Sequence, residues 1–165
     1  MNFYITSGTF DFLNKMKEKN PNENMVIMQN NENAVLLHET MQKTVFRMPK
    51  SYEVIHSIQS FENAGFAVMN YIPLTDEERP IFEFRFKNNH TPLQSQAGFN
   101  ALRILRPRKG NTYIIITFWE KEKFYKDWKA TSTYQNFFNQ TDTASTQLQL
   151  FSGSSYIKEY FISNE

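Results

Sequence analysis

Residues 66–78, with the sequence FAVMNYIPLTDEE, change from an apolar run to a helix-capping sequence over a few positions. The run Phe66–Ile72 predicts a strand. Thr75 and Glu78 have the spacing of a capping box, in which a hydroxyl and a carboxylate satisfy the free amides at the start of a helix. Aromatic residues then occupy every second position, which a strand would also show (Phe82, Phe84, Phe86). Because the cap and Pro80 in the first turn favour a helix, we predict a strand followed by a helix.

The sequence downstream of this helix predicts a hairpin, two short helices placed end to end and a final strand. Aromatic side chains share one face of the first helix (Phe124, Tyr125, Trp128) and recur at helical spacing in the second (Tyr134, Phe137, Phe138). Residues 139–155 are polar and rich in Thr, Ser and Gln, so a loop is expected there. The predicted strands are 101–106, 113–119 and 156–162, and the predicted helices are 120–130 and a segment beginning near 132.

The sequence upstream has the same order in shorter elements. A strand and a helix that ends before Asn20-Pro21 come first, and an Asn-rich hairpin and two further strands follow. The predicted strands are 3–5, 25–28, 34–38, 44–47 and 52–58, and the helix begins at Thr9.

Two successive β-α-β-β halves predict an α+β protein. One such half leaves its sheet open at an edge, so two halves in one chain can pair edge to edge and close a barrel without a second subunit. We therefore expect a monomer built as an internal pseudo-dimer. One irregular α+β domain is the alternative, because halves of different length do not by themselves establish a repeat.

The composition is that of a folded protein with little net charge. Of 165 residues, 40% are hydrophobic and 16% aromatic, and 18 Lys+Arg against 17 Asp+Glu give a charge of +1. The positive residues are scattered, which argues against nucleic acid as a partner. The chain has no cysteine, which excludes thiolate sites and suits a reducing compartment. Since no signal-like segment and no apolar run of roughly 20 residues is present, we expect a cytoplasmic protein, with peripheral membrane association left open.

Side chains that usually mark a catalytic site are scarce. The histidines stand far apart and outside any metal-binding spacing, so no metal site and no role is expected for them (His38, His56, His90). Asn70 interrupts an apolar run, where its amide must be paired or face a cavity, unless it belongs to a turn at Pro73. The aromatic residues of the last two helices either wall a pocket for a flat ligand or fill a core.

Motifs along nearly the whole chain resemble the antibiotic biosynthesis monooxygenase (ABM) superfamily, in particular the heme-degrading monooxygenases of the HmoB type and the related TRAP family of staphylococcal signal transduction proteins. The second half carries the ABM motifs: Phe66-Ala67-Val68-Met69-Asn70, Arg79-Pro80, Phe86-Lys87-Asn88, Gly98-Phe99, Leu105-Arg106-Pro107, Thr117-Phe118-Trp119-Glu120 and Asp127-Trp128. The first half resembles the amino-terminal extension of both groups: Tyr4-Ile5-Thr6, Gly8-Thr9, Asp11-Phe12-Leu13, Met28-Gln29 and His38-Glu39-Thr40. The resemblance implies tandem ferredoxin-like halves with a central antiparallel β-barrel flanked by helices, divided into a degenerate half at 1–62 and an ABM domain at 63–165.

The resemblance also implies a heme site between the strand of Asn70 and the last two helices. In such enzymes an asparagine hydrogen-bonds the iron-bound oxygen species and a tryptophan distorts the porphyrin, and Asn70 and Trp128 stand at these positions. The proximal histidine of the family lies ten residues after the tryptophan, where this chain has Phe138, which cannot coordinate iron. Tyr134, one helical turn earlier, and His90 are the substitute ligands that the sequence offers.

Two functions follow from the resemblance. One is a heme-binding and heme-degrading monooxygenase that uses O₂ and an external electron donor such as a reductase, with Asn70 and Trp128 as catalytic residues and Tyr134 and Phe138 also at the heme. The alternative is a TRAP-like signal transduction or stress-related binding protein without catalytic activity, whose pocket accepts another flat small ligand or none. Phe138 leaves the enzymatic activity open, because aromatic packing can retain a porphyrin but cannot activate O₂ on it.

Overall fold

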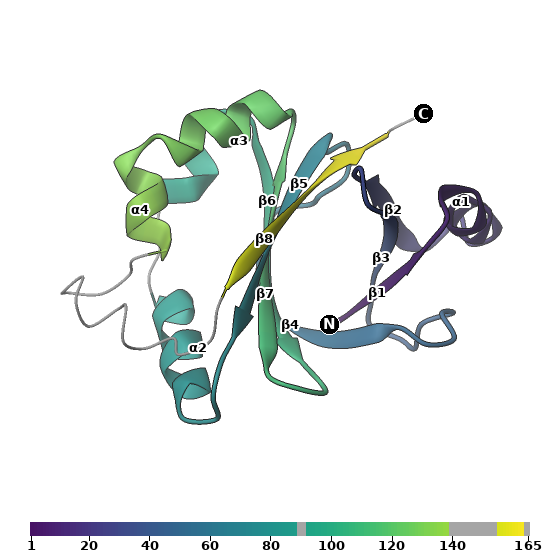
Figure 1. Cartoon of the computed structure of the whole chain (residues 1–165), viewed down its shortest axis with the longest axis horizontal. Helices are drawn as coiled ribbons and strands as arrows, with labels where there is room; N and C mark the ends of the chain where they lie inside the picture. The colour runs from purple at the N-terminus through teal and green to yellow at the C-terminus, as the bar shows by residue number, and fades with distance from the viewer. Residues whose placement is uncertain (89–91, 139–154, 164–165) are drawn as a thin grey trace.

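Eight antiparallel strands close into a barrel in the part of the chain that the structure describes, and the helices pack outside it (Figure 1). The computed structural model describes residues 1–88, 92–138 and 155–163. The strands are β1 (Asn2–Gly8), β2 (Asn24–Gln29), β3 (Ala34–Thr40), β4 (Lys50–Ile58), β5 (Phe66–Pro73), β6 (Phe99–Pro107), β7 (Thr112–Trp119) and β8 (Tyr156–Ile162). The helices are α1 (Phe10–Lys19), α2 (Glu78–Asn88), α3 (Glu122–Lys129) and α4 (Ser132–Phe138), with a short 3-10 helix η1 (Pro92–Ser95).

The order of the strands around the barrel shows the tandem halves. Neighbouring strands follow the order β1-β3-β2-β8-β5-β7-β6-β4, and β4 closes the barrel on β1. The first half has the order β4-β1-β3-β2, and the second half has the corresponding order β8-β5-β7-β6. The halves meet where β2 pairs with β8 and where β4 pairs with β6. Each half thus covers the open edges of the other, and the predicted α+β fold with two ferredoxin-like halves and a central barrel is confirmed.

Helices cover the barrel on two opposite sides. Figure 1 shows α2, α3 and α4 together on one side and α1 on the other. Alternate residues of β5 serve different cores: Ala67 and Met69 belong to the barrel interior, whereas Phe66 and Val68 pack under α2, α3 and α4. None of the helices in the described residues has the length and apolar character needed to cross a membrane.

The start of α2 has the predicted capping box. The Thr75 N–H donates to Glu78 Oε1 at 2.8 Å, and the Glu78 N–H donates to Thr75 Oγ1 at 3.2 Å. Phe82 and Phe86 are buried, whereas Phe84 is 69% exposed. Because residues four apart share one face of a helix, this burial pattern is helical, and the helix prediction is confirmed.

One predicted strand, at 44–47, is wrong. Residues 41–49 connect β3 to β4 without strand pairing. The Phe46 N–H donates to Thr44 Oγ1 at 3.1 Å, and the same hydroxyl lies 3.0 Å from Nδ1 of the buried His38. Phe46 packs with Leu13 of α1 in a small separate core. A side-chain hydrogen bond therefore takes the place of the strand ladder.

The remaining predicted elements agree with the structure, including the end-to-end pair α3 and α4 and the last strand β8. Of the predicted loop at 139–155, all but Ser155 lies outside the described residues.

Candidate functional site

Asn70 is buried on the helix-covered side of the barrel. It lies within β5 opposite Ile115 of β7, and not in the turn at Pro73. The alternation along β5 puts its side chain on the same face as Phe66 and Val68. The residue is 7% exposed, and its Nδ2 donates to the Ile115 carbonyl at 3.5 Å, the upper limit for a hydrogen bond. The amide is therefore held weakly and retains the capacity to bind a further polar group.

Trp128 is the centre of an aromatic cluster between α3, α4 and the barrel. Its ring is fully buried, and ring centroids lie 5.1 Å away for Trp119, 4.9 Å for Tyr134 and 5.8 Å for Phe137. Its Nε1 is buried and has no hydrogen-bond partner among the described residues. Trp128 therefore packs as a core residue and presents no exposed ring face. The aromatic cluster comprises Trp119, Tyr125, Trp128, Tyr134, Phe137 and Phe138.

Thr131 fixes the turn that brings α4 onto Trp128. Its hydroxyl donates to the Trp128 carbonyl at 2.6 Å and accepts from the Tyr134 N–H at 3.3 Å. The end of α3 and the start of α4 are thereby joined, and the Tyr134 ring meets the Trp128 ring edge to face at 87°. Gly98, next to the start of β6, permits α3 to approach, since its φ is +77° and an added Cβ would lie 2.0 Å from Cγ of Phe124.

Tyr134 and Phe138 share one face of α4, as their spacing predicts. Their ring centroids are 5.0 Å apart, and the Phe138 ring lies 6.2 Å from that of Trp128. Burial raises the pKa of the Tyr134 hydroxyl, which disfavours the phenolate that would ligate iron. The structure therefore brings three of the four predicted site residues together in the aromatic cluster.

Asn70 lies on the same side of the barrel as the aromatic cluster but farther along β5. Phe66, at the start of β5, contacts Tyr125 of the cluster with ring centroids 5.9 Å apart. Four residues at about 3.3 Å each separate Phe66 from Asn70 along the strand, or roughly 13 Å. The buried Val68 occupies the face between them.

Among the described residues, the aromatic cluster offers a heme iron no ready ligand. Phe138 has no donor atom, and the described residues contain no group of three metal-ligating side chains. His38 lies under α1 on the opposite side of the barrel, where its Nε2 is 2.8 Å from Glu23 Oε1. His56 of β4 lines a small pocket with Glu83 and Phe86 of α2 and not the aromatic cluster, and His90 lies outside the described residues. A porphyrin could touch the ring of Trp128 only if the aromatic side chains around it were displaced.

A charged network between α2 and the barrel is a feature that the sequence analysis missed. Arg106 of β6 donates to both carboxylate oxygens of Glu83 on α2 and, at 2.9 Å, to Glu53 of β4. The Tyr113 hydroxyl donates to Glu83 and accepts from Arg79 Nε at 3.2 Å. The hydrogen bonds from Arg106 lower the pKa of Glu83, and burial raises that of Tyr113. Glu83 is thus a stably ionised structural group. The alternation in β6 and β7, which turns Arg106 and Tyr113 toward the helices, is the signal that could have revealed it.

The model of the antibiotic biosynthesis monooxygenase family matches residues 65–140. The signal transduction protein TRAP of Staphylococcus aureus (strain bovine RF122 / ET3-1) is 30% identical over 136 residues, which cover 82% of this chain and 81% of that protein. A heme-degrading monooxygenase of Listeria monocytogenes is 28% identical over 136 residues, with coverages of 82% and 81%. A solved structure described as a major regulator of staphylococcal pathogenesis aligns with a TM-score of 0.86 at 27% identity and covers 98% of both chains. The chain therefore belongs to the antibiotic biosynthesis monooxygenase family, and its relatives include both TRAP proteins and a heme-degrading monooxygenase.

Proposed function

We propose that this protein is a non-catalytic member of the ABM family, a TRAP-like signal transduction or stress-related binding protein. The observation that carries the proposal is Phe138, which stands in the aromatic cluster where the family resemblance calls for an iron-ligating histidine. Its ring packs against Tyr134 and Trp128 with centroids 5.0 Å and 6.2 Å away. A hydrocarbon ring in this position stabilises the cluster and cannot bind iron.

The state of Tyr134 and Trp128 supports the same proposal. Tyr134 would ligate iron as a phenolate, but burial raises its pKa. Trp128 would have to face a porphyrin to distort it, but its ring is fully buried against its aromatic neighbours. Of the residues that the resemblance implies at the heme, only Asn70 would then keep its implied role.

Heme binding with heme degradation is the second candidate, and Asn70 favours it. Its amide is buried in an otherwise apolar strand, and the one hydrogen bond that it makes within the described residues, to Ile115, is weak and leaves it able to bind a ligand atom. The Listeria monocytogenes relative named as a heme-degrading monooxygenase supports heme as the ligand. Bound heme would supply the oxygen chemistry, an external reductase would supply electrons, and Asn70 would hold a polar atom of the ligand by a hydrogen bond.

We also propose that the chain divides at 1–62 and 63–165 and functions as a monomer. The corresponding strand orders of the two halves support this division. The closed barrel supports the monomer, since none of the described strands has an edge left for a second subunit. The absence of cysteine from the whole sequence supports a cytoplasmic location.

A hemin titration followed in the Soret region, with ascorbate then added under air, tests the proposed function. With catalase present, the wild type should cause no more loss of heme on ascorbate than the same mixture without protein. Phe138→His restores an imidazole and should produce a ligated-heme spectrum. Phe12→His is the matched control, because Phe12 is 54% exposed on α1 on the opposite side of the barrel.

Saturable one-to-one binding by the wild type that weakens in Trp128→Ala and is followed by ascorbate-driven bleaching would overturn the proposal. That result would establish the heme-degrading candidate. An equal gain of heme ligation in Phe12→His would show that the gain in Phe138→His is not specific to α4.

A further inference from the structure

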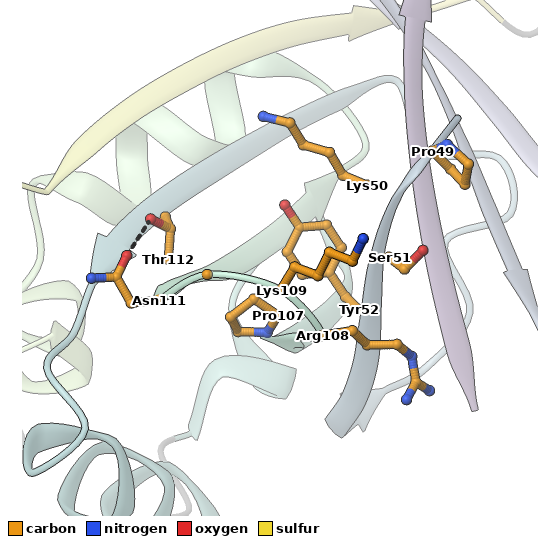
Figure 2. A pocket seen from close by; sticks show the side chains of 10 residues that line it. Pro49, Lys50, Ser51, Tyr52, Pro107, Arg108, Lys109, Asn111 and Thr112 are labelled. Atoms are coloured by element: carbon orange, nitrogen blue, oxygen red, sulfur yellow. Dashed lines mark hydrogen bonds between the residues drawn. The ribbon is translucent and has the colours of Figure 1, made fainter. Parts of the chain in front are cut away.

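One end of the barrel opens into a pocket that lies apart from the helix-covered face. It has a volume of about 590 Å³ and is formed by the start of β4 and the turn between β6 and β7, as Figure 2 shows. Its lining includes Lys50, Ser51, Tyr52 and Lys109. In Figure 2 the Tyr52 ring lies between the Lys50 and Lys109 side chains, whereas Arg108 points away from it.

A second pocket, of about 400 Å³, opens at the same end and shares Lys50 and Tyr52 with the first. Its lining adds Lys158 and Tyr160 of β8 and Tyr71 of β5. Both volumes fall within or near the range of small-molecule sites. We call the region spanned by the two pockets the barrel mouth and define it by Lys50, Tyr52, Tyr71, Lys109, Lys158 and Tyr160.

The charged side chains that line the two pockets are all cationic. The linings of the two pockets contain Lys50, Arg108, Lys109 and Lys158 but no Asp or Glu. Within the described ranges, none of these four cations forms an ion pair with a carboxylate, although Arg108 donates to Asn2 Oδ1. Several cationic groups therefore surround one opening without an ion pair among the described residues, although Glu32 acts electrostatically on Tyr160. An excess of cationic groups attracts anions.

The tyrosines add neutral hydroxyls and apolar walls to the barrel mouth, although the Tyr71 hydroxyl already donates to Met69 Sδ at 3.6 Å. Tyr52 and Tyr160 are 6% and 1% exposed and belong to the core of the barrel interior, and Tyr71 packs against that core. Burial raises the pKa of Tyr52 to about 12 and also raises that of Tyr71, so both hydroxyls keep their protons near neutral pH. Ile5 and Val35 line the same opening. A ligand here meets amines at the rim and rings and aliphatic groups deeper inside.

The opposite end of the barrel is closed by a buried ion pair. Arg103 Nε lies 2.5 Å from Glu39 Oε2, and both side chains are less than a tenth exposed. The Arg103 guanidinium lies 5.1 Å from the centre of the Phe61 ring, which stacks on Phe118 in the barrel interior. Among the described residues, this ion pair and the Phe61 ring fill the end of the barrel opposite the lysines.

We propose that the barrel mouth binds a small amphipathic anion, a carboxylate attached to an apolar body. The carboxylate is held by Lys50 together with Lys109 or Lys158 and accepts from a tyrosine hydroxyl. The apolar body lies against the Tyr52 and Tyr71 rings. This site uses none of the residues of the aromatic cluster and stands independently of the proposed function.

Amide chemical-shift mapping on the ¹⁵N-labelled full chain tests the proposal, with octanoate as the probe. Octanoate should shift the amides of 50–52, 108–112 and 158 saturably. Lys50→Glu and Lys158→Glu should each weaken binding about tenfold or more, since one charge-assisted contact is lost and a repulsive charge is gained. Lys15→Glu, an equal charge change at an exposed position of α1, should leave the affinity unchanged.

Two further probes separate the parts of the ligand. Inorganic phosphate supplies the anion without an apolar body, and 1-octanol supplies the body without the anion, so both should bind at least tenfold more weakly than octanoate. Equal binding of either probe would overturn the proposal, as would shifts confined to α3 and α4 or an equal loss in Lys15→Glu. If the lysine variants fail to fold, Tyr52→Phe removes a donor with little change of shape and should weaken octanoate binding without moving the site.

Discussion

Replacing Trp128 with alanine removes the central ring of the aromatic cluster. The ring is fully buried and has three aromatic neighbours with centroids within 6 Å, namely Trp119, Tyr134 and Phe137. Truncation of a buried tryptophan lowers the free energy of unfolding by about 3–5 kcal/mol, because the surrounding rings cannot fully collapse into the space. Trp128→Phe keeps part of the ring and removes an indole N–H that has no partner in the described residues. This milder variant should cost about 1–2 kcal/mol.

Urea unfolding followed by far-UV circular dichroism measures both changes without depending on tryptophan fluorescence. Phe84→Ala serves as the control, because Phe84 is 69% exposed on α2 and its truncation should change the free energy of unfolding by about 0.5 kcal/mol or less. A loss below about 1 kcal/mol in Trp128→Ala would refute the reasoning, because a fully packed core ring cannot be removed so cheaply. In that case Trp128 would be the wall of an open ligand site.

Three further variants test the fold around the site. Thr75→Ala removes one partner of the capping box and should lower the free energy of unfolding by about 1 kcal/mol in urea titrations. The pKa of Glu83 is lower in the folded chain than its ordinary value of 4.5, so its contribution to stability is present above that value and is lost as the pH falls through the folded pKa. Glu83→Gln should therefore flatten the decline in stability that urea unfolding measures between about pH 5 and pH 3. An unchanged decline would contradict the role of Arg106. Gly98→Ala should lower the thermal unfolding temperature more than Gly110→Ala, since both positions have positive φ but only at Gly98 would the new Cβ collide with a neighbour.

The fold could be predicted where neighbours in the sequence determine the local structure. Thr75 and Glu78 each accept a hydrogen bond from the other's backbone amide, so the segment 75–78 alone predicts the start of α2. The strand predicted at 44–47 failed because Thr44 is held by His38, a residue of β3 whose position the local pattern does not contain. Closure of the barrel was predictable because the open sheet edges of two halves in one chain can pair with each other.

The candidate site could be predicted in its residues but not in its packing. Helical spacing correctly placed Tyr134 and Phe138 on one face of α4. The complete burial of Trp128 depends on how α4 folds back at Thr131, and the sequence does not give that angle. The barrel mouth was missed because Lys50, Lys109 and Lys158 are far apart in the chain and meet only when the barrel closes.

The central claim is that the protein lacks the heme-degrading activity of part of its family. The most direct measurement is the loss of Soret absorbance when hemin and the wild-type chain are mixed with ascorbate under air, with catalase present to remove hydrogen peroxide. We expect no more heme loss than in the same mixture without protein. Heme loss that is proportional to the protein concentration and disappears in Asn70→Ala would contradict it.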